Sequence, residues 1–256
     1  MGSRNIIIGD VHGCAKELFN LVDSLHVNHT DTLIFCGDLV DKGPESAAVV
    51  RYIRGLTIQG VNVVLVKGNH EEKHERFRKH EERIAGTCKE NPIKNADVIR
   101  EITGSMHPDD IAFLDKAVMY HEIPEQNALV VHAGIPPWMT KLPNFASLSK
   151  SQHRRASQIL RLRYHDDDGK MIPLGDTNPT WHTFWADKYD GRFGHVFFGH
   201  EPFIGTEPRR FEHATGIDTG CVFGGSLTAT VFEKGAREPW FKSEPALKKY
   251  SKAFGE

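Results

Sequence analysis

Carboxylate, imidazole and amide side chains recur directly after short apolar segments along this chain. Asp10 and His12 follow the first segment two residues apart, so both side chains leave an extended backbone on the same face. The members that follow four later segments are Asp38, Asp41, Asn69, His70, His132 and His200. Oxygen and imidazole ligands without thiolates suit manganese, iron, zinc and similar divalent metals. These residue types therefore predict a metal site.

The group is large enough to hold two ions. Two ions need more ligands than one, and at least one carboxylate must bridge them. A pair of ions roughly 3.5–4 Å apart clamps the attacking and leaving oxygens in phosphoryl displacement. Each residue alone has a structural explanation, since an aspartate after glycine caps helices and closes turns. Their joint occurrence at successive strand ends favours a metal site.

Five short β-branched segments must position these side chains, and each runs into a polar motif that contains glycine. The first three segments alternate with helical patterns, and continuous apolar strands indicate sheets that are covered on both faces. In such folds the working site lies beyond the carboxyl ends of the strands. The predicted strands are residues 5–8, 32–36, 61–66, 128–131 and 195–198.

Three further regions complete the predicted plan. A last strand pair is predicted over residues 220–233. Residues 136–190 are polar and aromatic without a clean period, which predicts an insertion that caps the carboxyl edge of the sheet. The tail from residue 234 mixes Lys, Glu and aromatic residues and is predicted to be a surface helix. We therefore expect a single domain over residues 1–256.

The composition is that of a soluble globular protein. The 256 residues carry 32 Lys and Arg against 34 Asp and Glu, for a net charge of −2, and 39% are hydrophobic. This balance gives no support for a protein that coats nucleic acid. No apolar run approaches the ~20 residues of a membrane span. The four cysteines are scattered, which argues against a disulfide framework and favours reduced thiols in the cytoplasm.

Five short motifs carry a family resemblance. In chain order they read GDVHG (9–13), GDLVDKG (37–43), GNHE (68–71), HAG (132–134) and GH (199–200). Together they resemble the signature of the phosphoprotein-phosphatase branch of the calcineurin-like metallophosphoesterases, over about residues 5–233. Within that branch the chain is most similar to the diadenosine tetraphosphate hydrolases, through GDVHGC (9–14), FWADKYDG (184–191) and GIDTGCVFGGSLTA (216–229).

The resemblance implies a four-layer α/β/β/α sandwich with mixed sheets. It implies hydrolysis of a phosphoanhydride in a small nucleotide, a dinucleoside polyphosphate, with two divalent ions. Manganese is expected, with iron, zinc, cobalt and magnesium as alternatives. By resemblance, Asp10 and His12 would hold the first ion, Asp38 would bridge, and the second ion would be held by Asn69, His132 and His200. A hydroxide between the ions is the implied nucleophile, because metals lower the pKa of bound water.

The same resemblance assigns the remaining catalytic roles. His70 would protonate the leaving oxygen, and Asp41 would orient His70. Lys42 and an arginine of the insertion, Arg163 before Arg161, would face the charge that develops on the phosphoryl oxygens. The protein phosphatases carry arginine where this chain has Lys42, and lysine offers a point charge in place of a planar fork. Lys42 therefore favours the tetraphosphate hydrolases.

Three alternatives remain open from the sequence. The chain could be a serine/threonine protein phosphatase, a hydrolase of RNA caps or nucleotide-ended RNA, or a non-catalytic module that keeps the fold. A capped RNA end could be bound by a local basic patch, which contains Arg154, Arg155, Arg161 and Arg163. Loss of His70, Asp41 or a ligand would mark a non-catalytic module, and each of them is retained.

Several neighbouring features receive structural interpretations. Glu71 is predicted to support the site from behind its ligands or to charge a helix N-terminus. Residues 71–83 are predicted to be a solvated helix face, so His74 and His80 are not expected to be ligands. Core packing is favoured over stacking on a nucleobase for three aromatic residues of the insertion, Trp181, Phe184 and Trp185.

Overall fold

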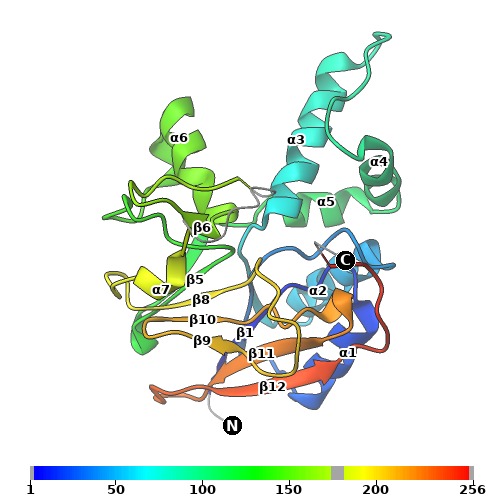
Figure 1. Ribbon diagram of the computed structural model, residues 1–256. Coiled ribbons are helices and arrows are strands. Elements are labelled where there is room, and N and C mark those ends of the chain that lie inside the picture. Colours follow the sequence, from blue (N-terminus) through cyan, green and yellow to red (C-terminus); the bar gives the residue numbers. More distant parts are fainter. Residues whose placement is uncertain (1–2, 174–181, 254–256) are drawn as a thin grey trace.

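The computed structural model describes residues 3–173 and 182–253 and is built around two β-sheets (Figure 1). The strands of the first sheet are β1 (Asn5–Ile8), β2 (Thr32–Phe35), β3 (Asn62–Leu65), β11 (Ser226–Phe232) and β12 (Trp240–Pro245). Their order is β12-β11-β1-β2-β3. β1, β2 and β3 are parallel, whereas β11 runs antiparallel to both of its neighbours, so the sheet is mixed.

The second sheet also has five strands and is also mixed. They are β4 (Tyr120–Ile123), β5 (Ala128–Val131), β8 (His195–Phe198), β9 (Arg209–Arg210) and β10 (Ala214–Gly216). Their order is β4-β5-β8-β10-β9, with β5, β8 and β10 parallel and the two edge strands antiparallel. A separate short pair joins β6 (Tyr164–His165) to β7 (Thr183–Phe184).

The helices lie on the outside of the sheets or project above them (Figure 1). Near the first sheet are α1 (Ala15–Ser24), α2 (Ser46–Ile58), α3 (Asn69–Ile84), α4 (Ala96–Gly104) and α5 (Pro108–Leu114). The insertion contributes α6 (Lys150–Ala156), a 3-10 turn (Ser157–Leu160) and α7 (Trp185–Lys188). The long helix α3 begins directly after β3, as the sequence pattern predicts.

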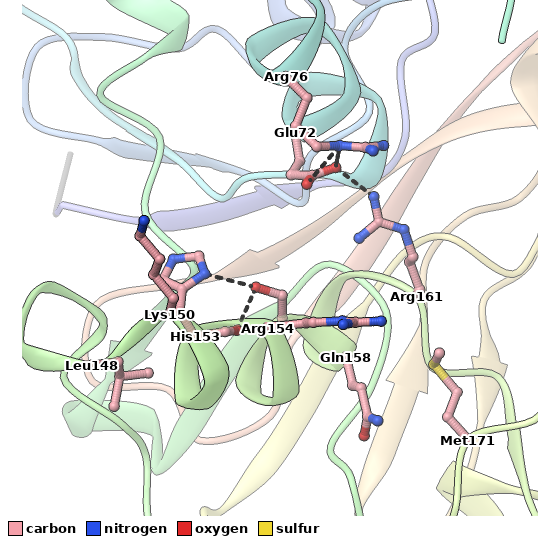
Figure 2. A pocket seen from close by; sticks show the side chains of 10 residues that line it. Glu72, Arg76, Leu148, Lys150, His153, Arg154, Gln158, Arg161 and Met171 are labelled. Atoms are coloured by element: carbon pink, nitrogen blue, oxygen red, sulfur yellow. Dashed lines mark hydrogen bonds and ion pairs between the residues drawn. The ribbon is translucent and has the colours of Figure 1, made fainter. Parts of the chain in front are cut away.

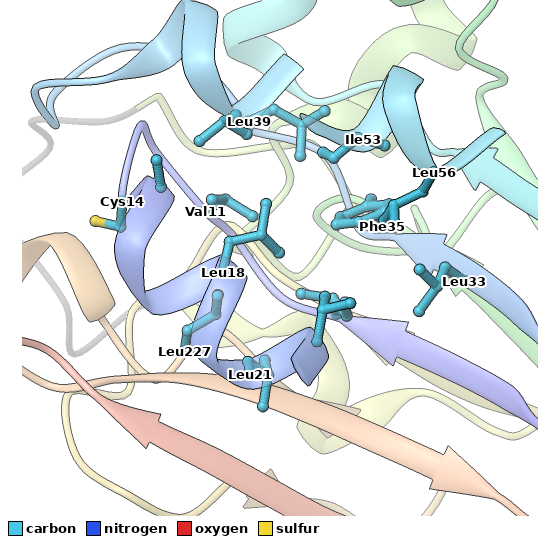
Figure 3. Close-up of a cluster of buried hydrophobic side chains, with 14 of the residues drawn as sticks. Val11, Cys14, Leu18, Leu21, Leu33, Phe35, Leu39, Ile53, Leu56 and Leu227 are labelled. Carbon is cyan, nitrogen blue, oxygen red and sulfur yellow. The ribbon is translucent and has the colours of Figure 1, made fainter. Parts of the chain in front are cut away.

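Alternation along the strands separates the apolar side chains into layers. Ile6 and Ile8 of β1 pack toward α1 and α2, where they join Leu18 and Ile53 in the largest buried cluster (Figure 3). Ile7 points to the opposite face and packs against the second sheet. A strand buried on both faces reads as a continuous apolar run, which is why the three buried positions of β1 are all isoleucine.

The outer face of the second sheet is covered by the insertion. Leu129 and Val131 of β5 pack with Ile159, Leu160 and Trp185, all of them buried. The insertion thus forms an outer layer on this sheet in addition to reaching the predicted site. This arrangement confirms the predicted sandwich with mixed sheets, and the extent of the single domain stays a prediction.

Two of the predicted elements are wrong. Residues 220–233 do not form a strand pair: Cys221–Phe223 make a 3-10 turn, and only β11 is a strand. The tail from residue 234 is not a surface helix, because residues Trp240–Pro245 form β12 and pair with β11. In both cases long-range pairing outweighs local composition, since β11 finds its partners in β1 and β12.

Candidate active site

The loops after five strands bring the predicted chemistry to one edge of the two sheets. Nδ1 of His132, after β5, donates to the carbonyl of Cys36, after β2, at 2.8 Å. The amide of His200, after β8, donates to Oδ2 of Asp10, after β1, at 3.0 Å. These two bonds join the second sheet to the first, so the site lies between them.

Several residues of the predicted site have a strained backbone conformation. In the described residues, eight non-glycine residues have a positive φ, and five of these belong to the predicted site. The five are His12 (45°), Asp38 (51°), Asp41 (71°), Lys42 (65°) and His200 (68°). A left-handed conformation costs a residue with a side chain about 1–2 kcal/mol, and such strain persists where surrounding contacts enforce it, commonly at functional sites.

Two glycines allow the carboxylates to approach the backbone. A Cβ atom on Gly68 would lie 2.2 Å from Oδ1 of Asp38, and one on Gly199 would lie 1.9 Å from Oδ1 of Asp10. Neither contact is possible for a larger residue without moving the aspartate. The glycines of the GNHE and GHEP motifs are therefore required by the position of the carboxylates.

Asp38 belongs to two groups of ligand atoms at once. Its carboxylate lies with His12 and His70 in one group and with His132 and His200 in the other, and the ligand atoms of each group lie within 4.8 Å of one another. The first group contains His70 where the sequence led us to expect Asp10. A carboxylate shared by two such groups has the position required to bridge two ions.

The tautomers of His12 and His132 leave a nitrogen lone pair directed into the site. Nδ1 of His12 donates to the carbonyl of Val40 at 2.9 Å, and His132 donates to Cys36. Metal-binding histidines are oriented in this way, with one ring nitrogen donating to a carbonyl and the other binding the ion. Oδ1 of Asn69 and Oδ1 of Asp38 lie 3.0 and 3.4 Å from Nε2 of His132. Electron-pair donors that face one another fit a cation.

Among the predicted metal ligands in the described part of the chain, two buried atoms lack a hydrogen-bond partner. They are Oδ1 of Asp10 and Nε2 of His200. A buried polar atom without a hydrogen bond costs about 1–3 kcal/mol, so it usually marks a bound group. Both atoms are of the kind that divalent metals bind. The residues at this edge therefore fit metal ions.

Electrostatics give the same result. Burial raises the pKa of Asp10 well above its usual value, and the nearby carboxylates of Asp218 and Asp38 raise it further. Burial lowers the pKa of His12 and of His200 well below the usual value, so both imidazoles are neutral, as metal ligands must be. Burial also raises the pKa of Asp218 to about 6. A buried cluster of acids and neutral imidazoles is stabilised by bound cations.

Glu71 fixes the loop that carries Asp38. Oε2 accepts from the amide of Asp38 at 2.8 Å and from that of Gly68 at 2.9 Å, while Oε1 accepts from the amide of Leu39 at 2.8 Å. The side chain is buried, and both of its carboxylate oxygens accept from these backbone amides. Glu71 thus supports the site from behind its ligands, one of the two roles considered for it from the sequence.

His74 was misassigned from the sequence. It was expected on a solvated helix face, but it is 1% exposed, and its Nε2 donates to Oδ1 of Asp41 at 2.8 Å. The other oxygen of Asp41 accepts from Nδ1 of His70 at 2.5 Å. His70 and His74 lie one turn apart on α3, on the same face. The carboxylate of Asp41 is therefore held by two histidines.

The three predicted cations lie in three different places. Nζ of Lys42 lies 2.7 Å from Nε2 of His12, inside the site. Arg163 reaches the rim, where it donates to the carbonyl of His200 at 2.7 Å and pairs with Glu201. Arg161 turns away and pairs with a carboxylate of α3. The geometry thus favours Arg163 over Arg161 as the residue beside the site.

Asp218 belongs to the site but was not predicted from the sequence. Asp218 follows β10 and is buried near Asp38, so it lies at a strand end like the other acids. Phe184 and Trp185 are core residues, as expected. Trp181 lies outside the described residues.

Comparisons with known proteins agree with this geometry. The profile of the calcineurin-like phosphoesterase family matches residues 4–225. Two relatives carry the name bis(5'-nucleosyl)-tetraphosphatase PrpE, asymmetrical. The relative from Halalkalibacterium halodurans is 32% identical over 88% of this chain and 89% of its own, and that from Bacillus subtilis is 30% identical over 88% and 89%.

Solved structures share the fold. The crystal structure of a candidate diadenosine tetraphosphatase is 27% identical, with a TM-score of 0.70 over 95% of this chain and 93% of the other. A serine/threonine phosphatase from Saccharomyces cerevisiae is 17% identical, with a TM-score of 0.51 over 96% and 81%, a likeness of fold alone. Within residues 3–173 and 182–253, no helix is long and apolar enough to cross a membrane.

Proposed function

This chain belongs to the calcineurin-like phosphoesterase family, and from that premise we propose that it hydrolyses dinucleoside polyphosphates such as diadenosine tetraphosphate. It is a metal-dependent hydrolase. We further propose that the site holds two metal ions, that these are manganese, and that the bond cleaved is a phosphoanhydride.

One observation carries the binuclear site: Asp38 lies in both groups of ligand atoms. We assign Asp10 and His12 to the first ion and Asp38 to the bridge. The ligands assigned to the second ion are Asn69, His132 and His200. When bound, the ions would supply an attacking water of lowered pKa and would neutralise charge on the phosphoryl oxygens.

Side chains of the site supply the proton for the leaving oxygen and orient the group that donates it. His70 holds a proton on Nε2 for the leaving oxygen, while its Nδ1 donates to Asp41 and keeps the ring in one orientation. Lys42 lies within the site, and its ammonium group faces the charge that develops on the phosphoryl oxygens. Arg163, beside His200, offers a second cation at the rim.

The choice of substrate is supported by the relatives. They are about 30% identical over most of both chains and are named as tetraphosphatases of the asymmetrical kind. Lysine at position 42 and the segment 216–229 favour the same group over protein phosphatases. Asymmetrical cleavage adds one water to diadenosine tetraphosphate and gives ATP and AMP. We therefore propose these products.

A substrate panel tests the proposal. The metal-loaded protein is incubated with diadenosine tetraphosphate, a phosphoserine peptide and capped RNA, and the products are resolved by ion-exchange chromatography. We expect kcat/KM to be largest for diadenosine tetraphosphate, with ATP and AMP in equal amounts. Two ADP would overturn the asymmetrical cleavage. Faster turnover of the phosphopeptide or the capped RNA would overturn the choice of substrate.

A further inference from the structure

A second feature lies beside the site, in a basic cleft between α3 and the insertion. The basic cleft has a volume of about 550 Å³, and Figure 2 shows its walls. Glu72 and Arg76 of α3 form one wall. The opposite wall and the ends are formed by Leu148, Lys150, His153, Arg154, Ser157, Gln158, Arg161 and Met171.

The charge of the basic cleft is strongly positive. Its lining contains four Lys and Arg side chains and one carboxylate, that of Glu72. Glu72 pairs with Arg76 at 2.9 Å and with Arg161 at 2.5 Å, so one acid holds two guanidinium groups from opposite walls. Lys150 and Arg154 form no hydrogen bond or ion pair with the described residues. Four positive charges against one carboxylate favour an anionic ligand.

Both walls of the basic cleft begin close to active-site residues along the chain. Glu72 is two residues after His70 on α3, and Arg76 lies about 9 Å further along the axis than His70, at 1.5 Å of rise per residue. On the opposite wall, Arg161 is two residues before Arg163, which is bound to the carbonyl of His200. On both walls the cleft therefore begins within two residues of a side chain of the site.

Dinucleoside polyphosphates are long anions of this kind. Beyond the anhydride that is cleaved they carry further phosphates and a second nucleoside, which the metal ligands do not reach. The Lys150 and Arg154 side chains, which have no ion pair with another described residue, can bind phosphate oxygens. The apolar side chains of Leu148 and Met171 offer a surface for a base.

We propose that the basic cleft binds the distal phosphates and nucleoside of the substrate, and that Lys150 and Arg154 are its specificity-determining residues. The inference rests on the proposed function. The cleft is assigned to substrate binding alone, so the roles of the residues that hold and cleave the reacting phosphate do not change.

The test compares two neighbouring arginines on α6. Arg154 lines the basic cleft, whereas the guanidinium of Arg155 stacks on Trp138, 4.2 Å from the ring centre, and lies outside the lining. The variants are the double variant Lys150→Gln with Arg154→Gln, and the control Arg155→Gln. For each protein we measure kcat and KM for diadenosine tetraphosphate and the inhibition constant of inorganic phosphate.

The proposal predicts a rise of about tenfold or more in KM for the double variant, because two contacts with charged groups are lost. The kcat value and the inhibition constant of inorganic phosphate should stay within about twofold, because phosphate is too short to reach the cleft. The Arg155→Gln control should match the wild type. An unchanged KM in the double variant, or an equal rise in the control, would overturn the proposal.

Binding of inorganic tripolyphosphate to the metal-free proteins separates this proposal from the proposed function. If the wild type does not cleave diadenosine tetraphosphate, the proposed function fails, and calorimetry still decides whether the cleft binds polyphosphate. Affinity that falls about tenfold in the double variant alone supports an anion-binding cleft. Equal affinity in all three proteins overturns it.

Discussion

Asp41 and His74 are joined by a buried hydrogen bond of 2.8 Å, and this bond completes a row of three side chains that ends at His70. His70, which we propose as the proton donor, is therefore held by a carboxylate that itself accepts a second hydrogen bond, from His74. Asp41 has no freedom to rotate away, because each of its oxygens accepts from a different histidine. This relationship leads to the first prediction.

Loss of the hydrogen bond from His74 should slow catalysis without removing the metal. In His74→Phe the ring shape is kept but the donor is lost, so Asp41 can rotate and His70 is less well oriented. We expect kcat to fall about tenfold, a loss of roughly 1.4 kcal/mol. His74→Gln keeps a donor and should recover most of the rate. Equal rates in the two variants would show that His74 serves packing alone.

His70 should matter most when the leaving group needs a proton. We expect His70→Gln to lower kcat for diadenosine tetraphosphate by about 10²-fold or more, in the range typical of general acids. For p-nitrophenyl phosphate, whose leaving phenolate is already stable, the loss should be smaller. Metal content, measured by mass spectrometry, should be unchanged. A lost ion would instead make His70 a ligand, as its place beside His12 and Asp38 allows.

Glu71 should be a stability determinant as well as a support for the site. Glu71→Ala leaves three buried backbone amides without an acceptor, at Asp38, Leu39 and Gly68. We expect the free energy of unfolding of the metal-free protein to fall by about 3 kcal/mol, measured in urea. The exposed Glu82 on the same helix provides the control, and Glu82→Gln should change stability by less than about 0.5 kcal/mol. An equal effect of the two substitutions would contradict this role.

The ion pair between Arg4 and Asp31 should make stability depend on pH. Burial alone would raise the pKa of Asp31, but the guanidinium of Arg4, at 2.7 Å, outweighs burial and holds it below the usual value. Between the folded and unfolded pKa values the unfolded chain binds more protons, so stability rises with pH there. The contribution is complete above the unfolded value of about 3.9 and is lost as pH falls through the folded value.

Arg4→Met tests this linkage. At pH 7 the free energy of unfolding of the metal-free variant should be about 3 kcal/mol lower than that of the wild type, because the buried carboxylate of Asp31 loses its charged partner. The difference should shrink as pH falls below about 4. A difference that is constant from pH 7 to pH 3.5 would show that Arg4 acts through packing.

The elements that carry the site are readable from the sequence because local signals specify them. Apolar runs that end in glycine and aspartate or histidine predict β1, β2, β3, β5 and β8, and a charged pattern predicts α3. The pairing of β11 with β1 and β12 has no such signal. β11 and β1 lie more than 200 residues apart, and β12 begins in a stretch whose Lys and Glu content is typical of helices. Tertiary packing decides these strands.

The residues of metal-ligand type could be picked out from the sequence. The residues that position them, such as His74, were harder to find. His74 was missed because α3 is so highly charged that its buried face is hidden, although the four-residue spacing from His70 placed both on one face. Asp218 carried a usable signal, since it follows an apolar strand as Asp10 and Asp38 do. The sequence indicated one wall of the basic cleft through the basic patch that contains Arg154 and Arg161, but not the other, because Arg76 is far from them in the chain.

The central claim is that a metal-dependent site centred on Asp38 cleaves dinucleoside polyphosphates. The direct measurement is the rate at which ATP and AMP form from diadenosine tetraphosphate when manganese is titrated into the metal-free protein. The account predicts no turnover without metal, a rate that saturates at two ions per chain, and loss of that rate in Asp38→Asn. Turnover without metal, saturation at one ion, or an undiminished rate in Asp38→Asn would contradict it.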